Sequence, residues 1–299
     1  MRVRDAFFQK IYEKTCAGED IVIVSSDIGA PSLDDFRRDY PQRFVNVGIA
    51  EQNAIAVAGG LCLSGKKVIT YGLNPFPVTR AFDQVRNILS ALNLPIAVTA
   101  LNAGTCSAEA GYTHIPMENM SIMRTLGNVK LLNFSDESMA IQGAEEVISN
   151  PAPRYIQFDK YIDGNNADRT DFDFEKGFFI TNPEERKTVV TYGIYAAELR
   201  KAHVPYRIID CFALPVNEKS FVQELEKSSV VVTLDDGTIT GGIGSMVLEL
   251  LNTHQISLPV YRKGITSSPD HLDYNMNRTT IWKREEINLS NVLREVEAL

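Results

Sequence analysis

Short runs of β-branched and other apolar residues alternate with helical stretches along almost the whole of this 299-residue chain. Residues 21–25 (IVIVS), 96–100 (IAVTA) and 229–234 (SVVVTL) are typical of buried strands. Residues 50–63, which precede Gly65, and residues 79–92 predict helices. Strands that alternate with helices of this length indicate parallel sheets covered on both faces, so we expect an α/β protein.

A polar, acidic stretch interrupts this alternation near the middle of the chain. Residues 161–186 include the sequence DGNNADRTDFDFEKG and show no sustained period of either kind. Such a composition is typical of a connection between domains. We therefore predict two tandem parallel-sheet α/β/α modules, at residues 1–160 and 187–299, joined by a connecting segment at 161–186.

Charge and cysteine content exclude several classes of protein. Thirty Lys and Arg residues stand against 38 Asp and Glu residues, which gives a net charge of −8. Nucleic acids and anionic membranes attract positive surfaces, so we expect neither as a general partner. The four cysteines form no C-x-x-C pair, which argues against a disulfide framework or a zinc site. The sequence shows no signal peptide and no apolar run of spanning length, so we expect a cytoplasmic protein.

The block NVGIAEQN, at residues 46–53, places a carboxylate at a candidate ligand site. A predicted strand ends there, Gly48 permits a tight turn, and Glu51 falls in the first turn of the next helix. Ligands of open α/β sheets bind at the carboxyl ends of strands, where Glu51 is expected. A carboxylate in this position also stabilises the helix dipole, by about 0.3–1 kcal/mol. The pattern alone leaves both interpretations open.

Two further loops carry residues of chemical interest. His114 lies in GYTHIPME, after a predicted strand and before a helix, and is either catalytic or structural. Phe76 lies in the turn YGLNPFP, where it either caps the core or offers a flat face to a ring. The four histidines are widely separated, and none has a carboxylate or cysteine at ligand spacing, so we predict no metal ligands.

A glycine-rich run, GTITGGIG at residues 237–244, follows another predicted strand. It matches neither G-x-G-x-x-G nor G-x-x-x-x-G-K-[ST], it lacks the lysine of a phosphate loop, and Asp235 and Asp236 precede it. Close packing of a helix on a strand is therefore the preferred interpretation of these glycines.

Taken together, these blocks resemble the pyrimidine-binding domain of transketolase-like enzymes. FVNVGIAEQN, the NPF turn with TRAFDQVRN, and GYTHIPMENMSIMR are similar in order and spacing to the family's NVGIAEQN, APF…RAFEQIR and DGATHQALEDIALMR. This resemblance covers about residues 21–158, and DDGTITGGIGS more loosely resembles the family's C-terminal domain. The resemblance implies a pyrimidine-binding domain followed by a transketolase C-terminal-like domain.

The resemblance also implies a cofactor and a partner. Transketolase-like enzymes hold thiamine diphosphate between two domains, one of which binds the diphosphate through Mg²⁺ and carries a GDG…N motif. This chain has no such motif, so it resembles the second half of a transketolase whose first half is a separate N-terminal subunit. That partner is expected to hold Mg²⁺. Two copies of each subunit, an α2β2 heterotetramer, give the simplest closed arrangement.

Roles for individual residues follow from the same resemblance. Glu51 matches the glutamate that hydrogen-bonds the pyrimidine ring nitrogen and shuttles a proton, which is general acid/base catalysis. Phe76 matches the aromatic residue that stacks on the pyrimidine, and Arg80 lines the same wall. Asp27 matches an acidic residue near the thiazolium, and His114 matches the histidine that contacts the reacting oxygens of the substrate. The implied substrate-binding residues are Ser26, Asn102, His114 and Lys160.

Substrate-handling positions depart from the family's pattern. Relatives carry His where this chain has Asn102, Asp at Ala110, Gln at Ile115, and a phosphate-binding arginine at Lys160. Ala110 removes a carboxylate that hydrogen-bonds a donor hydroxyl in relatives, and Lys160 can pair a phosphate only as a point charge. Since the cofactor-handling residues match, we expect thiamine chemistry on a non-standard substrate.

The expected activity is transfer of a two-carbon ketol unit from a ketose donor to an aldehyde acceptor, both small sugars. Two alternatives stay open. One is a thiamine-dependent enzyme that decarboxylates a 2-oxo acid, for which Arg80 is the obvious carboxylate-binding candidate. The other is a non-catalytic assembly subunit with the same fold, against which Glu51 argues because such a subunit has no reason to keep that carboxyl group.

Overall fold

The computed structural model describes residues 1–164, 172–266 and 276–299. The chain divides into two compact units, and each consists of two stretches of sequence. The first unit contains Met1–Ala103 and Thr125–Asp171, and the second contains Gly104–Arg124 and Phe172–Leu299. The segment predicted as a connection, 161–186, is shared between the units, and its residues 165–171 lie outside the described residues.

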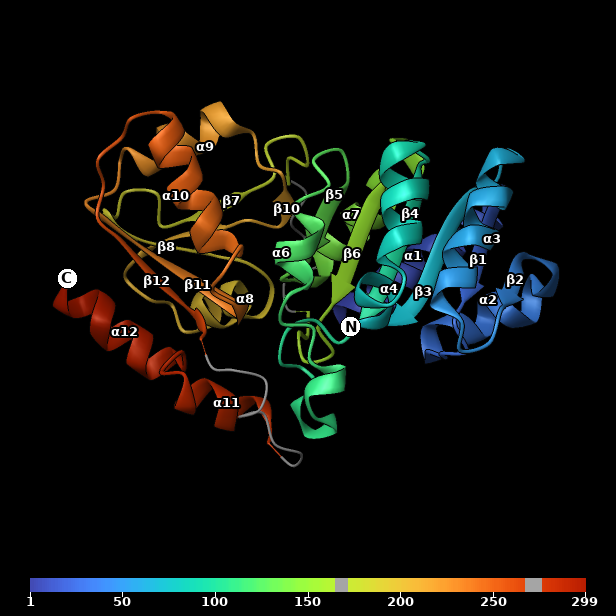
Figure 1. The fold of residues 1–299 in the computed structure, drawn as a ribbon, viewed down its shortest axis with the longest axis horizontal. Coiled ribbons are helices and arrows are strands. Elements are labelled where there is room, and N and C mark those ends of the chain that lie inside the picture. Colours follow the sequence, from blue (N-terminus) through green and yellow to red (C-terminus); the bar gives the residue numbers. More distant parts are fainter. Residues whose placement is uncertain (165–171, 267–275) are drawn as a thin grey trace. The chain divides into compact units, whose positions relative to one another are not determined.

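A parallel sheet forms the centre of the first unit (Figure 1). Its strands lie in the order β5 (Lys130–Asn133), β6 (Arg154–Phe158), β4 (Ile96–Leu101), β3 (Lys67–Leu73), β1 (Ile21–Ser25) and β2 (Phe44–Asn46). Neighbouring strands in this series are all parallel. Every residue of β1 is buried, which explains why this strand is a continuous apolar run in the sequence. The predicted parallel module is confirmed here.

Helices cover both faces of this first sheet. Helix α3 (Glu51–Leu63) contacts β1, β3 and β4, and Figure 1 shows it in front of the sheet. Helices α1 (Val3–Cys16) and α7 (Glu137–Ser149) contact each other behind it. The ring of Phe8 in α1 lies 5.1 Å from that of Tyr71 in β3. Shorter turns connect β1 to β2: η1 (Pro31–Leu33), α2 (Asp34–Asp39) and η2 (Pro41–Arg43).

The single helix predicted at residues 79–92 is wrong in detail. The structure has three short pieces instead, α4 (Phe76–Thr79), α5 (Phe82–Gln84) and the π-helical η3 (Val85–Ala91). The helical turn widens at Ala81, whose N–H donates to the carbonyl of Phe76, five residues back, at 3.3 Å. Ala81 is fully buried, so the widened turn keeps a small side chain in the core at the break.

The second unit contains a mixed sheet. Its strands lie in the order β12 (Val260–Ile265), β11 (Val230–Thr238), β8 (Lys187–Thr191), β9 (Arg207–Asp210) and β7 (Phe179–Thr181). The first four strands are parallel, but β7 pairs with β9 in the antiparallel direction. The predicted α/β module is thus confirmed here as well, with β7, which lies within the segment 161–186, antiparallel to its neighbour β9. β7 is a half-buried edge strand of three residues, too short to show a sequence period.

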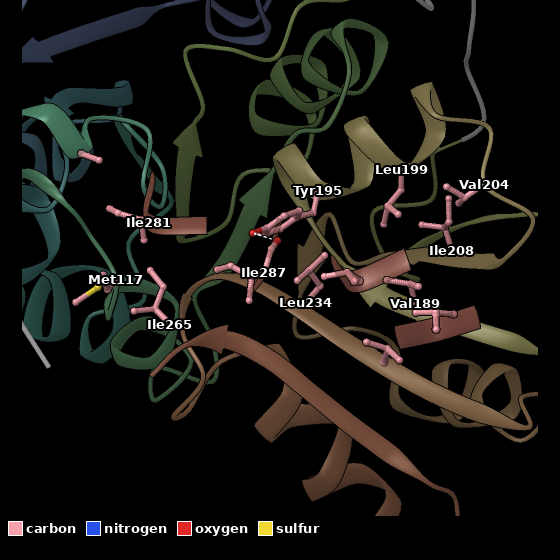
Figure 2. Close-up of a cluster of buried hydrophobic side chains, with 14 of the residues drawn as sticks. Met117, Val189, Tyr195, Leu199, Val204, Ile208, Leu234, Ile265, Ile281 and Ile287 are labelled. Atoms are coloured by element: carbon pink, nitrogen blue, oxygen red, sulfur yellow. Dashed lines mark hydrogen bonds between the residues drawn. The ribbon is translucent and has the colours of Figure 1, made fainter. Parts of the chain in front are cut away.

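Helices also surround the second sheet. Helix α10 (Ile243–Thr253) contacts β11, β12 and β8, and α9 (Glu218–Leu225) contacts α10. Apolar residues of α8 (Gly193–Lys201), α11 (Arg278–Arg284) and α12 (Leu289–Ala298) join a buried cluster with the sheet (Figure 2). The remaining elements are β10 (Ala213–Leu214), α6 (Asn119–Met123), η4 (Ala108–Ala110) and η5 (Tyr112–His114). Among the described residues, no helix combines the length and the apolar character needed to cross a membrane.

Candidate active site

The carboxyl ends of the parallel strands of the first unit meet at one edge of the sheet. Ser25, the last residue of β1, pairs with Asn46 of β2 and with Tyr71 of β3. Leu101, the last residue of β4, pairs with Leu73 and with Phe158. All but one of the predicted site residues follow these strand ends: Ser26, Asp27, Glu51, Phe76, Arg80, Asn102 and Lys160. This edge is where ligands of open α/β sheets bind.

Glu51 is the first residue of α3, and its carboxylate is buried. Arg80 Nη1 donates to Glu51 Oε2 at 2.6 Å. The two side chains differ in exposure, since 4% of the Glu51 side chain and 43% of the Arg80 side chain is accessible. The buried carboxylate therefore faces a cation that water can reach, in the first turn of a helix whose dipole also favours negative charge.

Arg80 also contacts the ring of Phe76. Its guanidinium carbon lies 4.3 Å from the ring centroid, a cation–π geometry. Gln52 Nε2 donates to the backbone carbonyl of Arg80 at 3.0 Å, which ties the start of α3 to the end of α4. The Phe76 ring is half-buried, unlike the neighbouring buried Pro77 and Val78. The structure thus brings Glu51, Phe76 and Arg80 together from two separate motifs.

A short chain of hydrogen bonds connects Asp27 to the turn before α3. Asn46 Nδ2 donates to Asp27 Oδ1 at 2.9 Å, and Asn46 Oδ1 accepts the N–H of Gly48 at 2.9 Å. Gly48 has φ +75°, a conformation that residues with a Cβ rarely adopt. Asn46 and Gln52 have no predicted role, although both lie in the NVGIAEQN block. Their position beside Glu51 is the only indication in the sequence that they belong to the site. Asp27 and Arg80, to which their side-chain amides donate, lie in other parts of the chain.

The predicted substrate-binding residues of this unit lie along the same edge. The N–H of Ser26 donates to the carbonyl of Tyr71 at 3.0 Å. Asn102 is buried and has φ +69° directly after β4. Lys160 follows β6, and its Nζ lies 5.1 Å from the centroid of the Tyr161 ring. Ser26, Asn102 and Lys160 therefore follow three strands of one parallel sheet.

His114 belongs to the second unit, in the segment Gly104–Arg124. It ends the short turn η5, is partly buried, and has Thr113 Oγ1 2.9 Å from its Nδ1. The next residue, Ile115, is buried in the apolar cluster of this unit.

The residues around Glu51 fit an aminopyrimidine. A buried carboxyl group can hydrogen-bond a ring nitrogen, and a half-buried phenyl ring offers a face for stacking. The described residues offer no comparable site for a metal ion. In residues 1–164, 172–266 and 276–299, no group of three or more His, Cys, Asp or Glu side chains is placed to hold an ion.

Comparison with known families identifies both domains of the chain. Residues 1–161 match the family model for the transketolase pyrimidine binding domain, and residues 182–287 match that for the transketolase C-terminal domain. The fold and the two family models thus define a transketolase-type α/β protein. The chain belongs to the transketolase family, whose members generally use thiamine diphosphate.

Individual members of the family are similar to the chain over most of its length. It is 25% identical, over 88% of its length and 86% of the relative's, to a putative transketolase C-terminal section of Methanocaldococcus jannaschii. It is also 25% identical, over 86% of each chain, to one of the subunits of an apulose-4-phosphate transketolase from Phocaeicola vulgatus. The solved structure of a split-gene transketolase, described as an inactive beta4 tetramer, superposes with a TM-score of 0.80 at 25% identity and covers 100% of this chain and 97% of its own. This chain thus corresponds to the C-terminal part of a split transketolase.

Proposed function

We propose that this chain is the C-terminal subunit of a thiamine diphosphate-dependent ketol transferase. It transfers a two-carbon unit from a ketose to an aldehyde once a separate N-terminal subunit supplies Mg²⁺ and the diphosphate site, in an α2β2 heterotetramer. The observation that carries this proposal is the buried Glu51 carboxylate paired with Arg80 beside the Phe76 ring. The names of the relatives, one a C-terminal section and the other a single subunit of a transketolase, support the need for a partner.

The residues of the first unit then prepare the cofactor. Bound thiamine diphosphate supplies the nucleophilic carbon that takes up the ketol unit. Glu51 holds a proton at the pyrimidine ring nitrogen, and Phe76 stacks on that ring and fixes its plane. Arg80 is accessible enough to turn away from Glu51 Oε2 when the ring nitrogen takes its place. This proton transfer is general acid/base catalysis, worth typically 10²–10⁴-fold.

Four other residues act on the substrate in this proposal. His114 exchanges a proton with the reacting oxygens, and Ser26 and Asn102 hydrogen-bond sugar hydroxyls. Lys160 pairs with a phosphate as a point charge, without the bidentate fork of an arginine. The name of the Phocaeicola vulgatus relative supports a phosphorylated ketose as donor. Asn102 and the small side chain of Ala110 support a donor that differs from the usual one.

Calorimetry followed by donor screening tests this proposal. Thiamine diphosphate with Mg²⁺ is titrated into this chain alone, into a candidate diphosphate-binding N-terminal subunit, and into their mixture. Tight binding only in the mixture, with cleavage of a ketose phosphate, is the expected result. Carbon dioxide release from pyruvate-like donors without ketose cleavage would favour a decarboxylating enzyme. No binding by a complex of confirmed size would favour a non-catalytic subunit.

A further inference from the structure

The segment that carries His114 is held against the glycine-rich run of β11 and α10, within the second unit. Four hydrogen bonds join the segment to that run. Thr238 N donates to Met117 O at 2.9 Å, and Ser121 Oγ donates to Thr240 O at 2.5 Å. Arg124 Nη1 donates to Gly241 O at 2.5 Å and to Gly242 O at 3.1 Å. The run GTITGGIG has no role in the proposed function. Its backbone contacts the C-terminal half of the segment, from Met117 to Arg124.

Apolar side chains of the segment complete the core of the second unit. Ala108, Ile115 and Met117 belong to one buried cluster with Val189 of β8, Leu234 of β11 and Ile265 of β12. Figure 2 shows Met117 near Ile265 and Ile281 at one end of this cluster. His114 directly precedes Ile115, so its C-terminal side is fixed by apolar packing.

The N-terminal side of the segment is fixed by one buried carboxylate, that of Asp236 in β11. Thr105 donates to it twice, from its N–H to Oδ2 at 3.0 Å and from its hydroxyl to Oδ1 at 2.5 Å. Trp282 Nε1 donates to Oδ1 at 2.8 Å, and Arg278 Nη2 donates to Oδ2 at 3.1 Å. Asp236 thus joins the segment to α11 and the sheet, through hydrogen bonds strengthened by its charge.

The backbone next to Thr105 is shaped to this carboxylate. Gly104 has φ +53°, and a Cβ there would lie 2.2 Å from Asp236 Oδ2. Only a glycine lets the segment start this close to the strand. The contact therefore depends on a specific backbone conformation at the start of the segment, in addition to the side-chain pairing.

We propose that Asp236 is a positioning residue that holds the start of the His114 segment and thereby fixes the imidazole for its work on the sugar. Asp236 itself does not contact the substrate. The C-terminal domain contributes to the substrate-handling step by holding the segment that carries His114. This inference rests on the proposed function only for the role of His114. The anchoring of the segment can be measured without any activity.

Hydrogen exchange of the full-length chain, read by mass spectrometry, tests the anchor first. Asp236→Asn keeps the size of the side chain but puts an NH₂ group against donors. We expect amides of residues 104–113 to exchange at least about tenfold faster. The matched control is Glu224→Gln, which changes a partly buried carboxylate of the same unit that pairs with Arg207 and Lys227. Unchanged exchange in 104–113, or the same increase in both variants, would overturn the proposal.

Kinetics of the assembled enzyme test the positioning role. Asp236→Asn should lower kcat/KM for the ketose donor about 10–100-fold and leave thiamine diphosphate affinity within about twofold, because Glu51, Phe76 and Arg80 belong to the other unit. Faster exchange with unchanged kcat/KM would refute the positioning role. If the unmodified enzyme transfers no ketol unit, the proposed function fails, and the exchange result still decides whether Asp236 holds the segment.

A milder variant covers the case in which Asp236→Asn does not fold. Thr105→Val removes one hydroxyl donor while keeping the shape of a fully buried side chain. It should raise exchange in 104–113 about threefold. Combined with Asp236→Asn, it should add less than its own single effect, because both changes break the same contact. Fully additive effects would contradict a shared anchor.

Discussion

Glu51 and Asp236 are both buried carboxylates next to the ends of parallel strands, but their surroundings differ. The Glu51 carboxylate meets the guanidinium of Arg80, a side chain that is 43% exposed. The Asp236 carboxylate accepts hydrogen bonds from Thr105, Trp282 and Arg278, all drawn from within its own unit. A buried carboxylate whose partner can move away can receive a ligand, whereas one surrounded by fixed donors serves to hold the fold.

Asp235, beside Asp236, shows a third environment. Burial raises its pKa to about 7, although the N–H groups of Ile243 and Gly244 and the hydroxyl of Tyr192 favour its charged form. Desolvation outweighs these hydrogen bonds. Neighbouring carboxylates on one strand therefore have different surroundings, which a count of acidic residues in the sequence does not reveal.

The largest expected effect is on turnover when Glu51 is changed. Glu51→Gln should lower the kcat of the assembled enzyme about 10²–10⁴-fold, because an amide cannot shuttle the proton. Glu137→Gln is the matched control, since Glu137 is also the first residue of a helix. Both variants lose a helix-dipole interaction of about 0.3–1 kcal/mol, but only Glu51→Gln should lose activity. Equal kcat values in the two variants would show that Glu51 serves only to interact with the helix dipole.

The second effect concerns stability against pH at Asp235. Its pKa in the folded state, about 7, lies above the ordinary value of 3.8, so the folded protein binds the extra proton between these pH values. The unfolding free energy should therefore fall, by up to roughly 4 kcal/mol, as pH rises from about 4 to 7. Denaturant unfolding of the unmodified chain and of Asp235→Asn across this range measures the difference. If the unfolding free energies of the two proteins change with pH in parallel, the Asp235 carboxyl group does not carry the extra proton in the folded state.

A smaller effect is expected at the ring of Phe76. Phe76→Ala should weaken thiamine diphosphate binding by the assembled enzyme about tenfold, which corresponds to a stacking contribution of about 1.4 kcal/mol. Tyr40→Ala removes another ring of the same unit under an arginine, Arg43, at 5.5 Å. Calorimetric titration should show unchanged affinity for that control. A similar loss in both would indicate a general effect of removing surface rings.

The smallest effect is expected at Arg80. Arg80→Lys keeps a positive charge near Glu51 but loses the planar face over Phe76, so cofactor affinity should fall only about two- to fivefold. Stability should change by less than about 0.5 kcal/mol, because the arginine is well exposed. Thermal unfolding and the same titration measure both values, with Arg43→Lys as control. A kcat of the assembled Arg80→Lys enzyme as low as that of Glu51→Gln would instead make Arg80 a catalytic residue.

Much of the fold follows from local sequence patterns. The run IVIVS forms β1 and is buried throughout, and α3 ends at Leu63, before Gly65, as predicted. The failures have local causes too. β11 continues through Asp235 and Asp236 to Thr238, beyond the predicted end at residue 234. Acidic residues are uncommon in strands, so the two aspartates did not indicate that the strand continues. Helix α11 was not predicted because Ile281 is its one buried residue among polar neighbours.

The interpretation of the glycine-rich run as close packing is confirmed, but it is incomplete. A Cβ at Gly244 would lie 2.5 Å from Thr233 Oγ1, so α10 does approach β11 too closely for a side chain. A Cβ at Gly237 would lie 2.7 Å from the carbonyl oxygen of Met117. The run therefore also accommodates the segment that carries His114, which no pattern within the run indicates.

The sequence by itself determined the α/β alternation and the position of Glu51 at the start of a helix after a strand, because hydrophobic period and turn residues are encoded within a few positions. The tertiary structure alone decided which groups meet. Arg80 lies 29 residues from Glu51, and Thr105 lies 131 residues from Asp236. Contacts over such separations depend on strand order, sheet register and the packing of whole units, and these arise from the summed burial of many side chains. The local pattern of residues near either partner does not indicate the other, and only the resemblance to a known family placed Arg80 at the site of Glu51.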